Sequence, residues 1–225
     1  PDWAEKIKCG IVSYGNHIVV TFSTILKENL VEDKFKELLK ERNIPELTAE
    51  RYRDIFGFPV VNYYVKAGFD FEKEPFEIPA KQYVKLYASG ASELKLFPDV
   101  VETLSYLKEN NYQLIVLSAM KDDNLKLMID NVNITHYFDS IFGIKDNYAR
   151  EKVSLGKQVV EKLNLNPSEC LMIGDTLHDA EVAEQCGFDC ILYSGGHVSK
   201  QRLKTKGLRI IERLSDIRNI ISMNS

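Results

Sequence analysis

The stretch Cys170–Asp179 reads CLMIGDTLHD, and it decides the fold. Its first four residues are apolar, as expected of a strand that is buried on both faces of a parallel sheet. The strand leads through Gly174 into Asp175, and Asp179 follows at the start of a predicted helix. Asp175 is therefore expected at the carboxyl end of a parallel strand, where open α/β sheets bind their ligands.

Helical patterns alternate with short apolar runs on both sides of this stretch, between residues 99 and 222. This alternation predicts an α/β fold with a Rossmann-like parallel sheet. Helices are expected at Asp99–Asn110, Asp123–Asn131, Lys152–Leu163, Asp179–Cys186, Ser199–Thr205 and Leu214–Ile221. Strands are expected at His17–Phe22, Tyr112–Leu117, Phe142–Ile144, Cys170–Ile173, Cys190–Tyr193 and Ile210–Ile211.

Residues 28–92 have a different texture, because they are rich in aromatic residues and show helical spacing without strands. Helices are expected at Leu30–Arg42, Thr48–Phe56, Phe58–Gly68 and Ala80–Ala88, with Thr48 as an N-cap. We interpret this segment as a helical cap inserted into a core of residues 1–27 and 93–225. Its aromatic side chains are expected to form a core rather than a ligand site.

Composition excludes several classes of protein. The 225 residues include 29 basic and 33 acidic ones, a net charge of -4, which argues against nucleic acid as a partner. No apolar run approaches ~18 residues, so no membrane span is expected. The four cysteines, Cys9, Cys170, Cys186 and Cys190, are expected to be buried thiols, which fits a reducing cytoplasm. The sequence predicts no oligomeric state.

Asp175 and Asp179 are four residues apart at one strand end, and two such carboxylates repel each other unless a cation or hydrogen bonds compensate. Mg²⁺ binds one or two protein carboxylates together with phosphate oxygens, so both residues are candidate metal ligands. The alternative is that Asp179 caps the helix and Asp175 caps a turn.

Two further candidates precede this strand. The predicted strand Tyr112–Leu117 runs into Ser118, whose hydroxyl could bind a phosphate oxygen together with the backbone N–H groups of Ala119 and Met120. Lys152 opens a predicted helix and could neutralise a phosphate or hold an aspartate ionised. Lys157, on the same helix, competes for that role.

In this order, Leu117-Ser118, Lys152 and Gly174-Asp175-x-x-x-Asp179 resemble the motifs of the haloacid dehalogenase-like (HAD) superfamily. The resemblance covers about residues 17–222 and extends to the inserted helical cap. It is closest to the phosphoglycolate-phosphatase-like branch, whose typical short motifs resemble Phe56–Pro59, Lys66–Gly68, Leu96–Asp99 and Ser194–His197. The resemblance implies a Mg²⁺-dependent phosphatase of small phosphorylated molecules, with Asp175 as a metal ligand.

The same resemblance implies an Asp-x-Asp-Gly-Thr motif after the first strand, in which the first Asp attacks phosphorus and the second acts as acid and base. With one residue deleted, Thr21 and Ser23 occupy these two positions; without a gap, Val20 and Phe22 do. Neither alignment supplies a carboxylate, because residues 6–27 contain no Asp or Glu.

We therefore expect a phosphatase fold with little or no turnover, and three accounts stay open. The chain is a pseudoenzyme that binds a phosphorylated ligand or a protein partner, or a phosphatase altered by a lesion or a misread start, or an enzyme that uses another group. His178 and His197 could touch a ligand, although loop histidines are more often solvated. The basic run Lys200–Lys206 is expected to be a solvated helix face.

Overall fold

The computed structural model describes residues 16–21, 29–90, 94–144 and 152–222. In these residues six strands form one sheet in the order β3-β2-β1-β4-β5-β6, and every neighbouring pair is parallel. The strands are β1 (His17–Val20), β2 (Gln113–Lys121), β3 (Ser140–Ile144), β4 (Cys170–Gly174), β5 (Asp189–Tyr193) and β6 (Arg209–Ile211). The predicted Rossmann-like α/β fold is confirmed.

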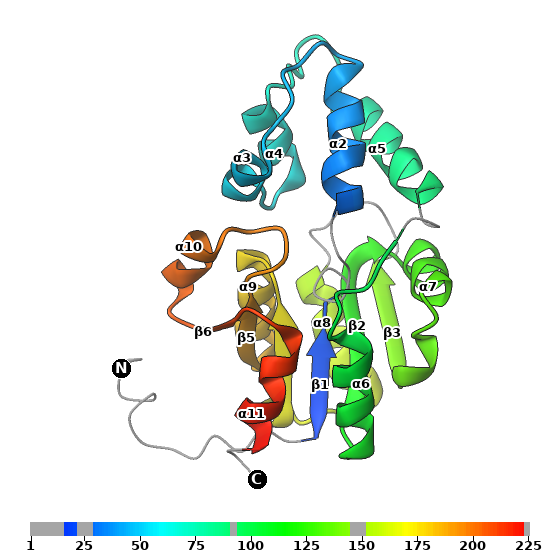
Figure 1. Cartoon of the computed structure of the whole chain (residues 1–225), viewed down its shortest axis with the longest axis vertical. Helices are drawn as coiled ribbons and strands as arrows, with labels where there is room; N and C mark the ends of the chain where they lie inside the picture. Colours follow the sequence, from blue (N-terminus) through cyan, green and yellow to red (C-terminus); the bar gives the residue numbers. More distant parts are fainter. Residues whose placement is uncertain (1–15, 22–28, 91–93, 145–151, 223–225) are drawn as a thin grey trace.

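Helices cover both faces of the sheet (Figure 1). They are α6 (Val100–Glu109), α7 (Asp122–Asn131), α8 (Lys152–Leu163), α9 (Leu177–Cys186), α10 (Lys200–Leu203) and α11 (Ile217–Ser222). One apolar core joins the sheet to α6, α7 and α11, with Leu104 and Ile129 fully buried. A second core joins it to α8 and α9 through Val159 and Val182. Short 3-10 turns lie at Thr135–Tyr137, Pro167–Glu169, Lys204–Lys206 and Leu214–Asp216.

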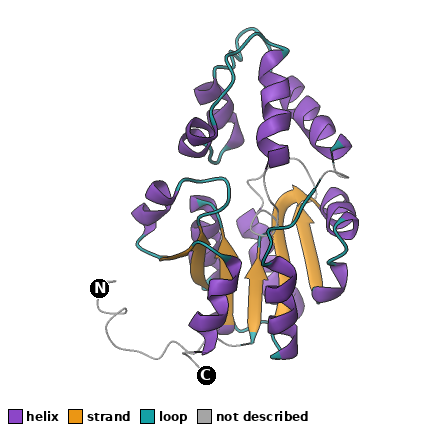
Figure 2. Ribbon diagram, in the orientation of Figure 1, coloured by secondary structure: helices purple, strands orange, loops and turns teal. Residues whose placement is uncertain are grey.

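Four more helices lie beyond the carboxyl ends of the strands, at the top of Figure 1, and this region contains helices and loops but no described strand (Figure 2). They are α2 (Asn29–Lys40), α3 (Ala49–Ile55), α4 (Val60–Ala67) and α5 (Glu77–Ser89). Their shared core contains the buried rings of Phe35, Tyr52, Tyr63, Tyr64 and Phe69, so these aromatic residues form a core as expected. We call this group of helices the cap; its boundaries at residues 28 and 92 remain a prediction.

Two element boundaries differ from the sequence prediction. β2 does not end before Ser118 but continues to Lys121, with an irregular register against β3 between Leu117 and Lys121. α9 begins at Leu177 rather than at Asp179, because Thr176 is its N-cap. By contrast, Thr48 caps α3 as predicted, and its hydroxyl accepts a hydrogen bond from the Arg51 N–H at 3.1 Å.

The cysteines of the described residues are free thiols, and Cys170 and Cys186 are buried as expected. Burial, with Glu169 and Cys186 nearby, raises the pKa of Cys170 to about 11. Cys190 is half-buried, and Cys9 lies outside the described residues. Across the part of the chain that the structure describes, no helix has both the length and the apolar character needed to cross a bilayer.

Candidate active site

Asp175 lies directly after β4, at the carboxyl edge of the sheet, where the sequence places it. Its side chain is completely buried. One carboxylate oxygen, Oδ1, accepts a hydrogen bond from the Thr21 hydroxyl at 3.3 Å, and the other accepts one from the His197 backbone N–H at 2.8 Å. The carboxylate therefore links the end of β1 to the loop after β5.

Asp179 lies one helical turn further on and is also buried. Its Oδ2 accepts hydrogen bonds from the Asp175 N–H at 3.0 Å, the Thr176 N–H at 2.9 Å and the Thr176 hydroxyl at 2.8 Å. The Thr176 hydroxyl in turn accepts from the Asp179 N–H at 3.1 Å, which completes a capping box. Asp179 thus holds the Asp175–Thr176 loop. The alternative that Asp179 is the N-cap of this helix is wrong, because Thr176 occupies that position and Asp179 is the third helical residue.

Gly174 is required by this loop. A Cβ atom on Gly174 would lie 2.2 Å from the Cβ of Asp179, far inside any normal contact. The absence of a side chain therefore lets the strand end approach the helix that carries Asp179.

Lys152 donates a hydrogen bond from Nζ to Oδ1 of Asp179 and forms a buried ion pair with it. Of the two roles expected for a lysine here, holding an aspartate ionised is the one that this contact fits. Burial alone would raise the pKa of Asp179, but the Lys152 ammonium and the Thr176 donors outweigh burial, so its pKa lies below the ordinary value. Lys157, the competing lysine on α8, is exposed.

Thr21 is the first residue after β1, and its side chain is 2% exposed. Its N–H donates to the Ile173 carbonyl at 3.1 Å, and its hydroxyl contacts Asp175. Val20, the alternative position of the nucleophile, lies in the apolar core beneath α6. Of the two alignments considered above, the one that uses Thr21 agrees with this geometry. Ser23 lies outside the described residues.

Ser118 lies on β2, next to β1, and is buried. Its hydroxyl accepts a hydrogen bond from the Met120 N–H at 3.1 Å. That N–H was a candidate phosphate donor, and here its partner is Ser118 itself. The half-buried Ala119 lies between them, within the longer β2.

The acidic groups fit a divalent cation only in part. Among the described residues no three His, Cys, Asp or Glu side chains are grouped as a metal site. Both Asp179 oxygens already accept hydrogen bonds from protein groups. From the described residues, Asp175 accepts one hydrogen bond at each oxygen, whereas Asp179 accepts several and is also paired with Lys152. Among the described carboxylates of this edge, Asp175 is therefore the better candidate to hold a cation, which would need water and ligand oxygens to complete its shell.

The two candidate histidines contact the cap. The ring of His178 lies 4.9 Å from that of Phe58, and its Nδ1 lies 3.3 Å from Glu181 Oε2. The ring of His197 stacks on Phe56 with its Nδ1 2.7 Å from the Tyr52 hydroxyl. Both rings therefore lie between the core and the cap.

Two residues of this region were not among the sequence candidates. Thr176 could have been identified, because Thr followed three residues later by Asp is a capping-box pattern. Arg202 belongs to the basic run expected to be a solvated face, and that expectation is wrong for this residue. Its Nη1 donates to the carbonyls of Arg53 at 2.9 Å and Phe56 at 2.7 Å, partners so distant in sequence that no local pattern indicates them.

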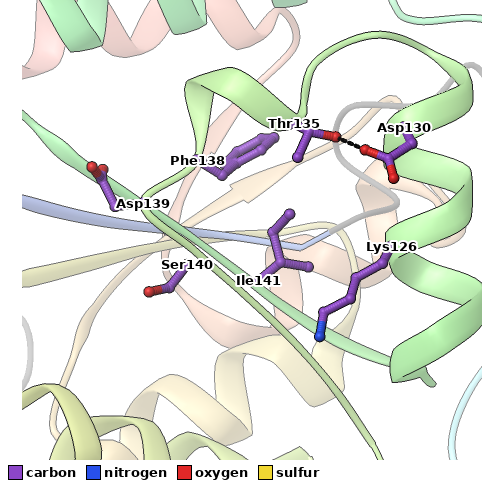
Figure 3. Close-up of a pocket in the computed structure, with 7 residues that line it drawn as sticks. All are labelled: Lys126, Asp130, Thr135, Phe138, Asp139, Ser140 and Ile141. Carbon is purple, nitrogen blue, oxygen red and sulfur yellow. Dashed lines mark hydrogen bonds between the residues drawn. The ribbon is translucent and has the colours of Figure 1, made fainter.

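A separate cavity of about 290 Å³ lies at the start of β3 (Figure 3). The residues that line it are Lys126, Asp130, Thr135, Phe138, Asp139, Ser140 and Ile141. It lies toward the amino end of the strand, whereas Asp175 lies at the carboxyl edge of the sheet. None of the candidate site residues lines it, so it gives no support to the chemistry discussed above.

The fold and the site define a class of protein: a capped α/β protein with an acidic site at the strand ends. The cap lies over the carboxyl edge of the parallel sheet, and the site at that edge contains the linked residues Thr21, Lys152, Asp175 and Asp179. A family model of the haloacid dehalogenase-like hydrolases matches residues 23–193. The chain belongs to this family.

The comparisons with individual proteins agree with the family. The chain is 29% identical over 130 residues to a phosphoglycolate phosphatase of Aquifex aeolicus, covering 57% of this chain and 59% of that one. A phosphoglycolate phosphatase of Pseudomonas aeruginosa is 23% identical over 127 residues, which cover 56% of this chain and 46% of that protein. The chain spans about half the length of such curated relatives. These similarities support the expected phosphoglycolate-phosphatase-like branch.

Solved structures match over nearly the whole chain. A haloacid dehalogenase-like hydrolase of Streptococcus pneumoniae superposes with a TM-score of 0.81 at 21% identity, covering 92% of this chain and 98% of that one. At this identity the likeness establishes the fold, including the cap, but not the reaction.

Proposed function

We propose that this protein is a phosphatase-type member of its family that binds small phosphate monoesters and hydrolyses them weakly or not at all. One observation carries the proposal. Thr21 follows β1 and contacts Asp175. It occupies the position at which the resemblance to the family implies a nucleophilic aspartate. The chain offers no substitute nearby, because residues 6–27 contain no Asp or Glu.

Threonine is a poor replacement for that aspartate. An alcohol becomes an effective nucleophile only when a base removes its proton. The group beside the Thr21 hydroxyl is the Asp175 carboxylate, and carboxylates are weaker bases than imidazole. Loss of a nucleophile lowers turnover by on the order of 10⁶ in a serine protease, which indicates the size of effect expected here.

The same geometry supports binding of a phosphorylated ligand with Mg²⁺. In this proposal Asp175 holds the cation, and Asp179, which the sequence also suggested as a ligand, instead holds the loop through Lys152 and Thr176. Mg²⁺ would supply positive charge to the phosphate oxygens, and Ser118 remains the candidate hydroxyl for one of them. With a single protein carboxylate, we expect the affinity for Mg²⁺ to be lower than in relatives that have two.

The second candidate is a protein that only binds, using the same pocket or its surface for a phosphorylated ligand or a partner. The hydrogen bond between Thr21 and the buried Asp175 favours this second candidate, because the two side chains bond to each other and neither is left as a reacting group. For either function we propose a cytoplasmic location, which the free buried thiols Cys170 and Cys186 support.

The test is hydrolysis of p-nitrophenyl phosphate and 2-phosphoglycolate with Mg²⁺ by the unmodified protein, Asp175→Asn and Thr21→Ala. We expect all three proteins to hydrolyse these substrates at or close to the background rate. Turnover by the unmodified protein in the ordinary enzymatic range, about 1–10³ s⁻¹, that Asp175→Asn abolishes would overturn the proposal of a disabled site. If Thr21→Ala abolished it as well, threonine itself would be the reacting group.

Binding is measured separately, by calorimetric titration of 2-phosphoglycolate in the presence of Mg²⁺. Binding without turnover, lost in Asp175→Asn, supports the second candidate. Absence of both binding and turnover would contradict any phosphate site at this edge.

A further inference from the structure

The loop between β5 and α10, residues 194–199, lies between Asp175 and the cap. On the core side, the His197 N–H donates to Asp175 Oδ2 at 2.8 Å. Gly196 is so close that a Cβ atom there would lie 2.2 Å from the same oxygen. The backbone of the loop therefore fits closely against the Asp175 carboxylate, and a shift of the loop would change how that carboxylate is held.

On the cap side, the side chain of His197 contacts α3 and Phe56, the residue directly after α3. The Tyr52 hydroxyl and His197 Nδ1 are 2.7 Å apart. The rings of His197 and Phe56 stack with centroids 4.4 Å apart and planes at 20°. His197 thus contacts the core through its backbone and the cap through its ring.

A second set of hydrogen bonds joins this loop and the helix that follows it, α10, to the same end of α3. The Ser199 N–H donates to the Arg53 carbonyl at 3.3 Å. Arg202 Nη1 donates to the carbonyls of Arg53 and Phe56. These carbonyls belong to the end of α3, where backbone acceptors lack partners within the helix. The end of α3 and Phe56 are therefore attached to this loop and to α10 by specific hydrogen bonds and not only by apolar contact.

We propose that His197 is a positioning residue that couples docking of the cap to the geometry of Asp175. When α3 is docked, the His197 ring fixes the loop, and the loop N–H orients the Asp175 carboxylate. Because such coupling is reciprocal, disturbing Asp175 loosens α3, and disturbing α3 loosens the loop around Asp175. The inference rests on Asp175 being part of the proposed site, but its test needs neither a ligand nor turnover.

The experiment is amide hydrogen exchange, followed by mass spectrometry, on peptides that cover residues 49–56 of the cap and 194–199 of the loop. Tyr52→Phe removes one hydroxyl from the cap, and we expect exchange in 194–199 to accelerate roughly fivefold, the effect of losing one ordinary hydrogen bond. Asp175→Ala removes the acceptor in the core, and we expect exchange in 49–56 to accelerate by a similar factor.

Two variants separate coupling from a general loosening of the structure. Tyr64→Phe removes a hydroxyl from another buried cap tyrosine, whose ring contacts are with Phe35, Tyr63, Phe69 and Phe76 inside the cap. This change should leave the exchange rate of 194–199 unchanged. His197→Asn keeps a side-chain group that can form a hydrogen bond to Tyr52. Its exchange rates in both peptides should therefore lie between those of the unmodified protein and those of His197→Ala.

The proposal is wrong if Tyr52→Phe changes only the cap peptide, or if Asp175→Ala leaves residues 49–56 at their original rate. It is also wrong if Tyr64→Phe accelerates the loop as much as Tyr52→Phe does. A disabled phosphatase and an active one give the same expected exchange pattern, so failure of this inference is distinct from failure of the proposed function.

Discussion

The buried pair of Lys152 and Asp179 determines how the site is organised at the scale of single residues. Both side chains are almost inaccessible, so neither charge is stable there without the other. The sequence singled out both residues as candidates, because Lys152 starts a predicted helix and Asp179 follows a predicted strand. It could not assign their partnership, because they are 27 residues apart and a metal ion or a phosphate would have explained the same two charges.

The lowered pKa of Asp179 predicts a specific pH dependence of stability. The unfolded carboxyl group has the higher pKa, near ~3.9, so near that pH the unfolded chain binds more protons. The stabilisation from Asp179 is therefore complete above about pH 5 and is lost progressively as the pH falls below that value.

Urea unfolding of the unmodified protein and of the double variant Lys152→Met/Asp179→Asn, which removes both charges of the pair, between pH 7 and pH 3 checks this dependence. We expect the difference in free energy of unfolding between them to be constant down to about pH 5 and to shrink below it. A difference that already shrinks between pH 7 and pH 5 would mean that the pKa of Asp179 is raised, which contradicts the ion pair described here.

At the scale of elements, the start of α9 shows what a sequence pattern determines and what it does not. The apolar run and the Gly-Asp step predicted β4 and the place of Asp175 correctly. The helix start was wrong by two residues, because Thr176 takes the N-cap and Asp179 is the third residue of the helix. The end of β2 was also wrong, since continued pairing with β3 carries the strand past Ser118.

Gly174→Ala tests the close approach of β4 to α9. The added methyl group would overlap the Asp179 side chain, so we expect a loss of about 1–3 kcal/mol in the free energy of unfolding, measured in urea. Gly57→Ala is the matched control, because its nearest neighbour would be the flexible Arg202 side chain at 3.7 Å. Equal stability of the two variants would show that the strand end is not packed as described.

At the scale of the whole molecule, the cap–core hydrogen bonds described above join the core to α3 and Phe56, and Tyr87 of α5 also packs against the apolar core. The sequence predicted a helical insert and its aromatic core, because helical spacing and aromatic density are local signals. It did not predict the contacts of Arg202, whose partners are 146 and 149 residues away. Such contacts depend on how the two parts dock, and no local pattern encodes that.

Arg202→Ala removes the donor to two carbonyls at the end of α3. We expect limited proteolysis to cleave the segment after α3 on the order of tenfold faster, since a hydrogen bond to a charged group is worth more than a neutral one. Lys204→Ala, an exposed change in the same basic run, should leave the cleavage rate unchanged. Identical rates for the two variants would show that Arg202 does not secure the cap.

The central claim is that the described part of the phosphatase framework is assembled and that the missing acidic pair after β1 is what disables it; the Gly of the implied motif is missing too, since Thr24 follows Ser23. The most direct measurement is p-nitrophenyl phosphate hydrolysis with Mg²⁺ by the double variant Thr21→Asp/Ser23→Asp, with circular dichroism as the check of folding and the triple variant that adds Asp175→Asn as the control.

We expect the double variant to hydrolyse p-nitrophenyl phosphate at least about a hundredfold faster than the unmodified protein. This factor is the lower end of what a positioned acid–base group alone contributes. The triple variant should return to background, because Asp175 is then missing from the restored site. A folded double variant with no gain in turnover would contradict the claim that the rest of the framework is competent.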